Sequence, residues 1–356
     1  MLRPFSGRTA VVPNAPVNRR PSNPGLSKSR ILLLSLLSAA SALEAGTLNL
    51  KLQSRLNLRD FGFASGERSV TGLLSSKGTI YGIASGEAVR VFQLSSDLAA
   101  VKMLARIPGQ ATARFGRSDK GICLCTSREH GGEVFELTAA GELKQIATFS
   151  QGIVCCLRSG GVLYAVGAKD GNLITNRPEG DTSLPVGDKI PFEERKAIAS
   201  DLFLLSNAVL LGGGGKLFSL ADAKLTPLAV LPCVPGRESW QAVEAFAYNG
   251  LLYAGTTDGY LFTWEAAASR LVNRGKPFRQ HAIQALTAYG AGVLGVGGEP
   301  EGMPRFFYFD PQRGFLLGGI PTMEGVGGLV ATGNKIVVGE LGRLGSVLIY
   351  ELVGEL

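Results

Sequence analysis

The chain has 356 residues, with 36 Lys and Arg against 29 Asp and Glu, and a formal net charge of +7 at neutral pH. The first 42 residues contain six of these basic side chains and no acidic one, so the rest of the chain is nearly neutral. Binding to nucleic acid depends on clustered Lys and Arg that neutralise phosphates. The composition of the remaining residues therefore excludes nucleic acid as an expected partner.

Residues 1–42 have the features of a signal peptide. A basic region precedes an apolar run at residues 31–37, and Ala40-Ser41-Ala42 supplies a small-residue cleavage pattern. The apolar run is shorter than the ~20 residues that span a bilayer, so we expect no permanent membrane span in the mature chain. We predict export, to the periplasm or by secretion, with residues 43–356 as a single domain. An organelle transit peptide is the alternative, because the leader is long and rich in Arg and Ser.

The mature chain contains seven copies of one pattern of short strands. The copies align on a third-strand position, and their mean period of about 43 residues is typical of four-stranded propeller blades. The residues at this position are Phe92, Phe135, Ile174, Phe218, Phe262, Phe307 and Ile349. The second strand carries another bulky series, which we interpret as core: Tyr81, Cys123, Tyr164, Leu210, Tyr253, Leu294 and Val337. We predict an all-β fold, a seven-bladed β-propeller with four-stranded blades.

The fifth copy shows the pattern best. Its strands are expected at residues 242–247, 251–255, 260–264 and 270–273. Asn249-Gly250 and Asp258-Gly259 separate the first three strands, and both dipeptides accept the positive φ angles of tight hairpin turns. The first copy has Lys77-Gly78 and Ser85-Gly86 at the same places.

The last copy ends too early to contain its own fourth strand. Residues 47–58 belong to no copy, and their alternation at Leu48, Leu50 and Leu52 is typical of a strand. We predict that this N-terminal strand pairs with the C-terminal blade. Such pairing would close the ring and remove the open sheet edges.

The phrase LLYAGTTDGYLF at residues 251–262 resembles the repeat unit shared by exported bacterial propellers of the quinoprotein-like, YVTN-like and NHL-like groups. The phrase FYFDPQRG at residues 307–314 is similar to the end of their third strand and its following turn. The resemblance covers residues 47–356 as a repeat architecture, and it implies a superfamily with many functions. The regular tryptophans of quinone-cofactor enzymes are absent, since Trp240 and Trp264 are the only two, so no quinone cofactor is implied.

Five cysteines show no C-x-x-C spacing and therefore indicate no zinc site. Cys123 and Cys125 share a face of one expected strand, Cys155 and Cys156 are adjacent on the next blade's inner strand, and Cys233 stands apart. We interpret them as small apolar side chains buried between blades. One disulfide in an exported protein is the alternative.

Charged and aromatic residues gather in the loops between second and third strands and between blades, at the end that we call the top face. The opposite turns are mostly Gly, Ser, Asn and Ala, so the asymmetry favours the top face as the functional one. The expected ligand-binding residues are Arg128, His130, Arg237, Trp240, Arg279 and His281, and the weak candidates for catalysis are Glu238, Arg279 and His281. We expect no metal site, because the chain has two histidines and no compact carboxylate cluster beside them, and no cofactor.

These features favour a monomeric, non-catalytic binding module that takes a protein, a glycan or a small ligand on its top face. One alternative is a lyase or hydrolase acting on a polysaccharide, in which Arg279 would neutralise a carboxylate and His281 would move a proton. A structural or assembly factor is the other alternative. The propeller fold does not choose among them, because one fold serves many unrelated functions.

Overall fold

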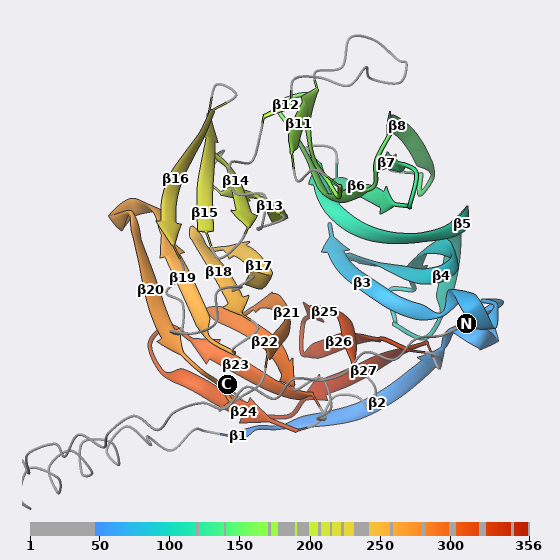
Figure 1. Ribbon diagram of the computed structural model, residues 1–356. Helices are drawn as coiled ribbons and strands as arrows, with labels where there is room; N and C mark the ends of the chain where they lie inside the picture. The colour runs from blue at the N-terminus through green and yellow to red at the C-terminus, as the bar shows by residue number, and fades with distance from the viewer. Residues whose placement is uncertain are drawn as a thin grey trace, which may run out of the picture. The chain divides into compact units, whose positions relative to one another are not determined.

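The computed structural model describes residues 47–118, 121–138, 140–169, 172–176, 189–190, 199–205, 208–213, 216–221, 224–230, 242–256, 259–278, 282–298, 304–319, 325–342 and 345–354. All of these lie in the compact unit Ala45–Leu356. The predicted leader lies outside the described residues. Strands dominate the described part, which confirms the all-β prediction (Figure 1). Three 3-10 turns accompany them: η1 (Leu58–Phe61), η2 (Ser65–Glu67) and η3 (Ala266–Ala268).

Three of the sheets have four strands each, arranged antiparallel. The first contains β13 (Ala199–Leu205), β14 (Ala208–Gly213), β15 (Lys216–Ala221) and β16 (Lys224–Val230). The second contains β17 (Ala242–Tyr248), β18 (Leu251–Thr256), β19 (Leu261–Glu265) and β20 (Arg270–Gly275). The third contains β25 (Val326–Thr332), β26 (Lys335–Glu340), β27 (Ser346–Leu352) and, beyond β27, the N-terminal β2 (Leu50–Asn57).

A fourth sheet has five strands, because a second piece of the N-terminal segment joins it. Its members are β21 (Ala282–Tyr289), β22 (Gly292–Gly298), β23 (Arg305–Asp310), β24 (Gly314–Gly318) and β1 (Thr47–Leu48). β1 runs parallel to β24, and Leu48 is buried between this sheet and the third one. The N-terminal segment therefore adds one strand to each of two neighbouring sheets.

The remaining strands form one ten-stranded sheet, which curls (Figure 1). Its strands are β3 (Ser69–Ser76), β4 (Thr79–Leu94), β5 (Val101–Ser118), β6 (Gly121–Ser127), β7 (Gly132–Leu137), β8 (Leu143–Phe149), β9 (Ile153–Ser159), β10 (Val162–Gly167), β11 (Leu173–Asn176) and β12 (Lys189–Ile190). β5 joins the parts of this sheet, because it pairs first with β4, then with β6, and at its end with β9.

In the first copy, the second and third strands form one continuous element, β4, which folds back on itself, since a Cβ added to Gly82 would lie 2.0 Å from the ring of Phe92. The element changes partner at the predicted turn, from β3 up to Ser85 to β5 from Gly86 onward. Gly86 also makes a close backbone contact, since a Cβ added to it would lie 1.6 Å from the carbonyl oxygen of Gly66. Only glycine lets the two backbones approach so closely. The turn predicted at Lys77-Gly78 is present, with φ angles of 50° and 77°.

The fifth copy agrees with the sequence to within two residues at every strand end. Asn249 and Gly250 have φ angles of 50° and 74°, as a tight hairpin requires. Six members of the bulky third-strand series are core, with at most 8% exposure: Phe92, Phe135, Ile174, Phe262, Phe307 and Ile349. Phe218 is half-buried and packs against a core cluster.

One residue of the second-strand series is shifted in the last sheet. In the sixth copy, the third-strand residue Phe307 pairs with Gly295, which directly follows the series member Leu294. In the seventh copy, the third-strand residue Ile349 pairs with the series member Val337 itself. The residue that matches the series is therefore Ile336. Sequence alignment missed this because both residues are apolar and fully buried.

The predicted pairing of the N-terminal strand with the C-terminal sheet is present. β2 runs antiparallel to β27, from Leu50 opposite Leu352 to Asn57 opposite Ser346 (Figure 1). An ion pair with a buried carboxylate stabilises this pairing, since Arg55 Nη2 lies 2.5 Å from Glu340 Oε2 on β26. The observed strand is shorter than the predicted residues 47–58, because β1 pairs elsewhere and η1 follows.

A second buried carboxylate fastens the start of the large sheet. Glu67 of η2 is 2% exposed and forms ion pairs with Arg90 of β4 and with Arg106 of β5, the latter at 2.7 Å. Burial alone would raise the pKa of Glu67, but hydrogen bonds and charge attraction from Arg106 and Arg90 outweigh it and lower the pKa. The carboxylate is therefore ionised at neutral pH and links η2 to the consecutive strands β4 and β5.

Candidate functional site

Five of the predicted site residues lie outside the described residues: Arg237, Glu238, Trp240, Arg279 and His281. Their roles in ligand binding and catalysis stay predictions. Only Arg128 and His130 of the predicted set are described, and both lie where β6 leads into β7.

Arg128 and His130 face different surroundings. Arg128 Nη2 donates to the carbonyl oxygen of Pro108 at 3.0 Å and lies 3.2 Å from Glu133 Oε2, so the guanidinium ties β7 to β5. The side chain of His130 is 88% exposed, and its Nε2 lies 3.7 Å from the equally exposed carboxylate of Glu129. Arg128 thus has structural contacts, and His130 has the solvated setting of an ordinary loop histidine.

A pocket of about 640 Å³ opens at the opposite end of the strands. Its walls come from the turns between β21 and β22, between β23 and β24, and between β25 and β26, together with the ends of β17 and β27. These turns join first to second and third to fourth strands, so they lie at the end away from the predicted top face. The lining residues are Tyr248, Ala288, Tyr289, Gly290, Ala291, Tyr308, Asp310, Arg313, Ala331, Gly333, Leu352 and Gly354. We call this the tyrosine pocket.

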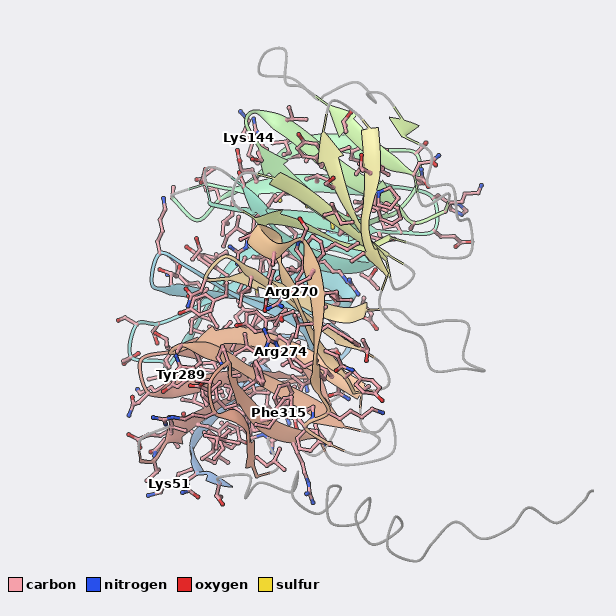
Figure 2. The ribbon with its side chains drawn as sticks, turned by 90° about the vertical axis from the view of Figure 1, so that its left-hand side faces the viewer. Lys51, Lys144, Arg270, Arg274, Tyr289 and Phe315 are labelled. Atoms are coloured by element: carbon pink, nitrogen blue, oxygen red, sulfur yellow. The ribbon has the colours of Figure 1, made fainter. Side chains whose placement is uncertain are left out.

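Three tyrosines give the pocket its aromatic character. The rings of Tyr289 and Tyr308 meet edge to face, with centroids 6.0 Å apart and planes at 89°. Tyr248 comes from the neighbouring sheet, and its hydroxyl donates to the carbonyl oxygen of Gly290 at 2.8 Å. This bond fixes the Tyr248 ring against the turn between β21 and β22. Figure 2 shows Tyr289 at the left of the view, with Arg274 and Phe315 nearer its middle.

The turn after β23 supplies the charged groups. Asp310 Oδ1 accepts hydrogen bonds from the backbone N–H of Gln312 at 2.7 Å and of Arg313 at 3.0 Å, so the aspartate organises the turn that carries Arg313. Pro311 sets the first turn position. Asp310 and Arg313 therefore have their backbone positions fixed before any ligand enters.

The phenol groups of Tyr289 and Tyr308 remain protonated at neutral pH. Burial raises the pKa of Tyr289 above its ordinary value. Burial, reinforced by the Asp310 carboxylate, also raises the pKa of Tyr308, while hydrogen bonds from the backbone N–H groups of Gly292 and Ala291 act in the opposite direction. Each phenol can consequently donate and accept hydrogen bonds beside an apolar ring.

The sequence prediction missed this pocket, although a signal was present. Tyr248 and Tyr289 each stand at the last position of a first strand, directly before the turns Asn249-Gly250 and Gly290-Ala291. Aromatic rings at the same place in successive copies, at strand ends where they stay half-buried, indicate a binding surface. The comparison of loop residues, which favoured the top face, did not include these tyrosines because each ends a strand.

No group of three or more His, Cys, Asp or Glu side chains within the described residues is placed to hold a metal ion. None of the helices in this part of the chain has the length and apolar character needed to cross a membrane.

No protein-family model matches the chain, and no curated protein is significantly similar to it. Solved structures do share its fold. One of them is the crystal structure of the computationally designed Ika8 protein, which has a TM-score of 0.50 and 14% sequence identity, over 80% of this chain and 97% of the designed one. At this identity the likeness concerns the fold alone.

Proposed function

We propose that the chain is a non-catalytic binding module built as a closed, seven-bladed β-propeller with four-stranded blades. The proposal is supported by the contacts between strands of successive sheets: β5 contacts β9, β9 contacts β13, and the series continues through β17, β21 and β25. β25 then contacts β3, and β3 contacts β5. The pairing of β2 with β27 supports closure as well, because it leaves no copy without a fourth strand.

The ligand that fits the tyrosine pocket is a neutral saccharide. Tyrosine rings offer apolar faces to the C–H groups of a sugar, and their hydroxyls offer donors and acceptors to its hydroxyl groups. The described lining contains one carboxylate, Asp310, and one guanidinium, Arg313, so the charges balance and favour an uncharged ligand. A volume of about 640 Å³ lies within the range of small-molecule sites.

The observation that carries this proposal is the convergence of Tyr248, Tyr289 and Tyr308, from two sheets, on one pocket. Their positions are held by β-strands and by the Tyr248 hydrogen bond to Gly290, so little ordering is needed on binding. Export of the protein, which the leader predicts, would place the pocket where free saccharides and glycan chains occur.

The test is a screen of neutral and anionic oligosaccharides on an array, followed by calorimetric titration of the best ligand. We expect a neutral oligosaccharide to bind and Tyr289→Ala to weaken its affinity at least about tenfold. Tyr260→Ala is the matched control, because Tyr260 packs against Phe262 and Lys276 away from the pocket. Circular dichroism should show both variants folded. Binding of anionic saccharides alone, or equal affinity in Tyr289→Ala, would reject the proposal.

A further inference from the structure

Three cysteine thiols from two strands meet between β6 and β9. Cys123 and Cys125 are on β6, Cys156 is on β9, and all three belong to one buried apolar cluster. Cys156 Sγ donates to Cys123 Sγ at 3.3 Å. Cys123 is fully buried and Cys156 is 2% exposed. All three are in the thiol form in this structure.

A glycine on the intervening strand makes this approach possible. β5 lies between β6 and β9 in the sheet, and its Gly116 is the direct partner of Cys123. A Cβ at Gly116 would lie 2.0 Å from the carbonyl oxygen of Cys156 and 2.8 Å from Cys123 Sγ. Any larger residue would therefore push the two cysteines apart.

The separation of the sulfur atoms is close to that of a bonded pair. A disulfide has an S–S length of about 2.05 Å, so the two sulfur atoms need to close by roughly 1.3 Å, which small rotations about both side-chain bonds can supply. The neighbouring Cys155 points to the other side of β9, where it packs with Leu157, Val166 and Leu173. It therefore has no comparable approach to Cys123.

We propose that Cys123 and Cys156 are a redox pair that a small disulfide such as oxidised glutathione converts into a disulfide bond between β6 and β9. One protein thiol loses its proton and attacks oxidised glutathione, which gives a mixed disulfide and releases one reduced glutathione. The second protein thiol then loses its proton and attacks the mixed disulfide, which forms the protein disulfide and releases a second reduced glutathione. The protein loses two electrons and two protons, and one glutathione disulfide becomes two thiols.

The bond should form during folding rather than afterwards. Hydrogen bonds with the Cys123 and Cys125 thiols, together with burial, raise the pKa of Cys156, so little of the reactive thiolate exists in the folded protein. Burial also keeps glutathione away from both sulfur atoms. An unfolded or partly folded chain has neither restriction. The cross-link would then join two consecutive copies of the strand pattern and constrain the unfolded chain.

The experiment uses the full chain, unfolded in denaturant and refolded with a mixture of reduced and oxidised glutathione. Free thiols are then alkylated in denaturant, and the cysteine-containing peptides are identified by mass spectrometry. We expect a cross-linked peptide containing Cys123 and Cys156, and a Tm that is higher by roughly 5 °C than that of a sample refolded with dithiothreitol. Folded protein exposed to the same mixture should acquire the cross-link at least about tenfold more slowly.

Variants separate this pair from the other thiols. Cys123→Ala and Cys156→Ala should each remove the cross-link and the Tm difference, whereas the matched control Cys155→Ala and the neighbour Cys125→Ala should keep both. The wild-type comparison with and without dithiothreitol decides the matter even where a variant fails to fold. Full alkylation of Cys123 and Cys156 after oxidative refolding, a bond that uses Cys125 instead, or glutathione adducts alone would overturn the proposal.

Discussion

Replacing Arg55 by Ala should destabilise the protein through the carboxylate that it leaves behind. Glu340 is fully buried, and its Oε2 lies 2.5 Å from the Arg55 guanidinium, which also donates from Nε to Ser346 Oγ at 3.0 Å. Removing one partner of a fully buried ion pair costs about 3–5 kcal/mol. The Arg55 side chain is 38% exposed, so solvent screens part of this interaction, and we expect about 2 kcal/mol.

Calorimetry should show this loss as a Tm lower by about 4 °C, since 1 kcal/mol shifts Tm by about 2 °C in a large domain. The double variant Arg55→Ala, Glu340→Gln should recover about 1 kcal/mol relative to Arg55→Ala, because burying a neutral amide costs less than burying a charge. The reasoning fails if Arg55→Ala changes stability by less than about 0.5 kcal/mol, the usual size of a surface substitution. It also fails if the double variant is less stable than the single one.

Three further changes test other parts of the structure. Gly295→Ala should lower stability by about 1–3 kcal/mol, because the added Cβ would lie 2.2 Å from the ring of the phenylalanine opposite it, while Gly319→Ala, which meets nothing within 4 Å, should be neutral in the same thermal melt. Glu67→Gln should lower Tm at neutral pH. Because the folded protein lowers the pKa of Glu67, the stabilisation by its carboxylate is complete above the unfolded pKa near 4.5 and is lost as the pH falls below that value. The Tm difference between Glu67→Gln and wild type should therefore shrink from neutral to acidic pH. A constant difference would contradict the ion-pair explanation. Replacing Arg279 and His281 together by Ala should leave saccharide affinity within about twofold in a calorimetric titration, because both precede the start of β21 whereas the pocket is lined by the end of β21 and the turn after it. A loss of about tenfold would instead favour the predicted top face.

The sequence predicted the local parts of the fold well. Strand alternation and the Asn249-Gly250 turn are decided by residues close in the chain, and the fifth copy accordingly matches its predicted strands. The N-terminal pairing could also be predicted, because residues 47–58 alternate and the last copy lacks a strand. Both inferences depend on patterns that can be recognised in the sequence without knowledge of tertiary contacts.

The parts that the sequence could not predict depend on contacts between distant residues. The close approach of the Gly66 backbone to Gly86 is one such contact, and no pattern in the neighbouring sequence indicates it. The tyrosine pocket requires turns from neighbouring sheets to come together, so Tyr248 and Tyr308 could not be assigned to one site from their spacing. The thiol pair of Cys123 and Cys156 similarly depends on the missing side chain of Gly116.

Hydrogen–deuterium exchange with and without the best saccharide from the array would locate the binding site directly. Ligand bound in the tyrosine pocket should slow exchange in peptides covering residues 288–292, 308–313 and 331–333, because their backbone amides form its rim. Peptides covering residues 128–131, 237–241 and 279–281 should be unchanged. Protection confined to this second group would contradict the tyrosine pocket as the binding site and place the ligand on the top face.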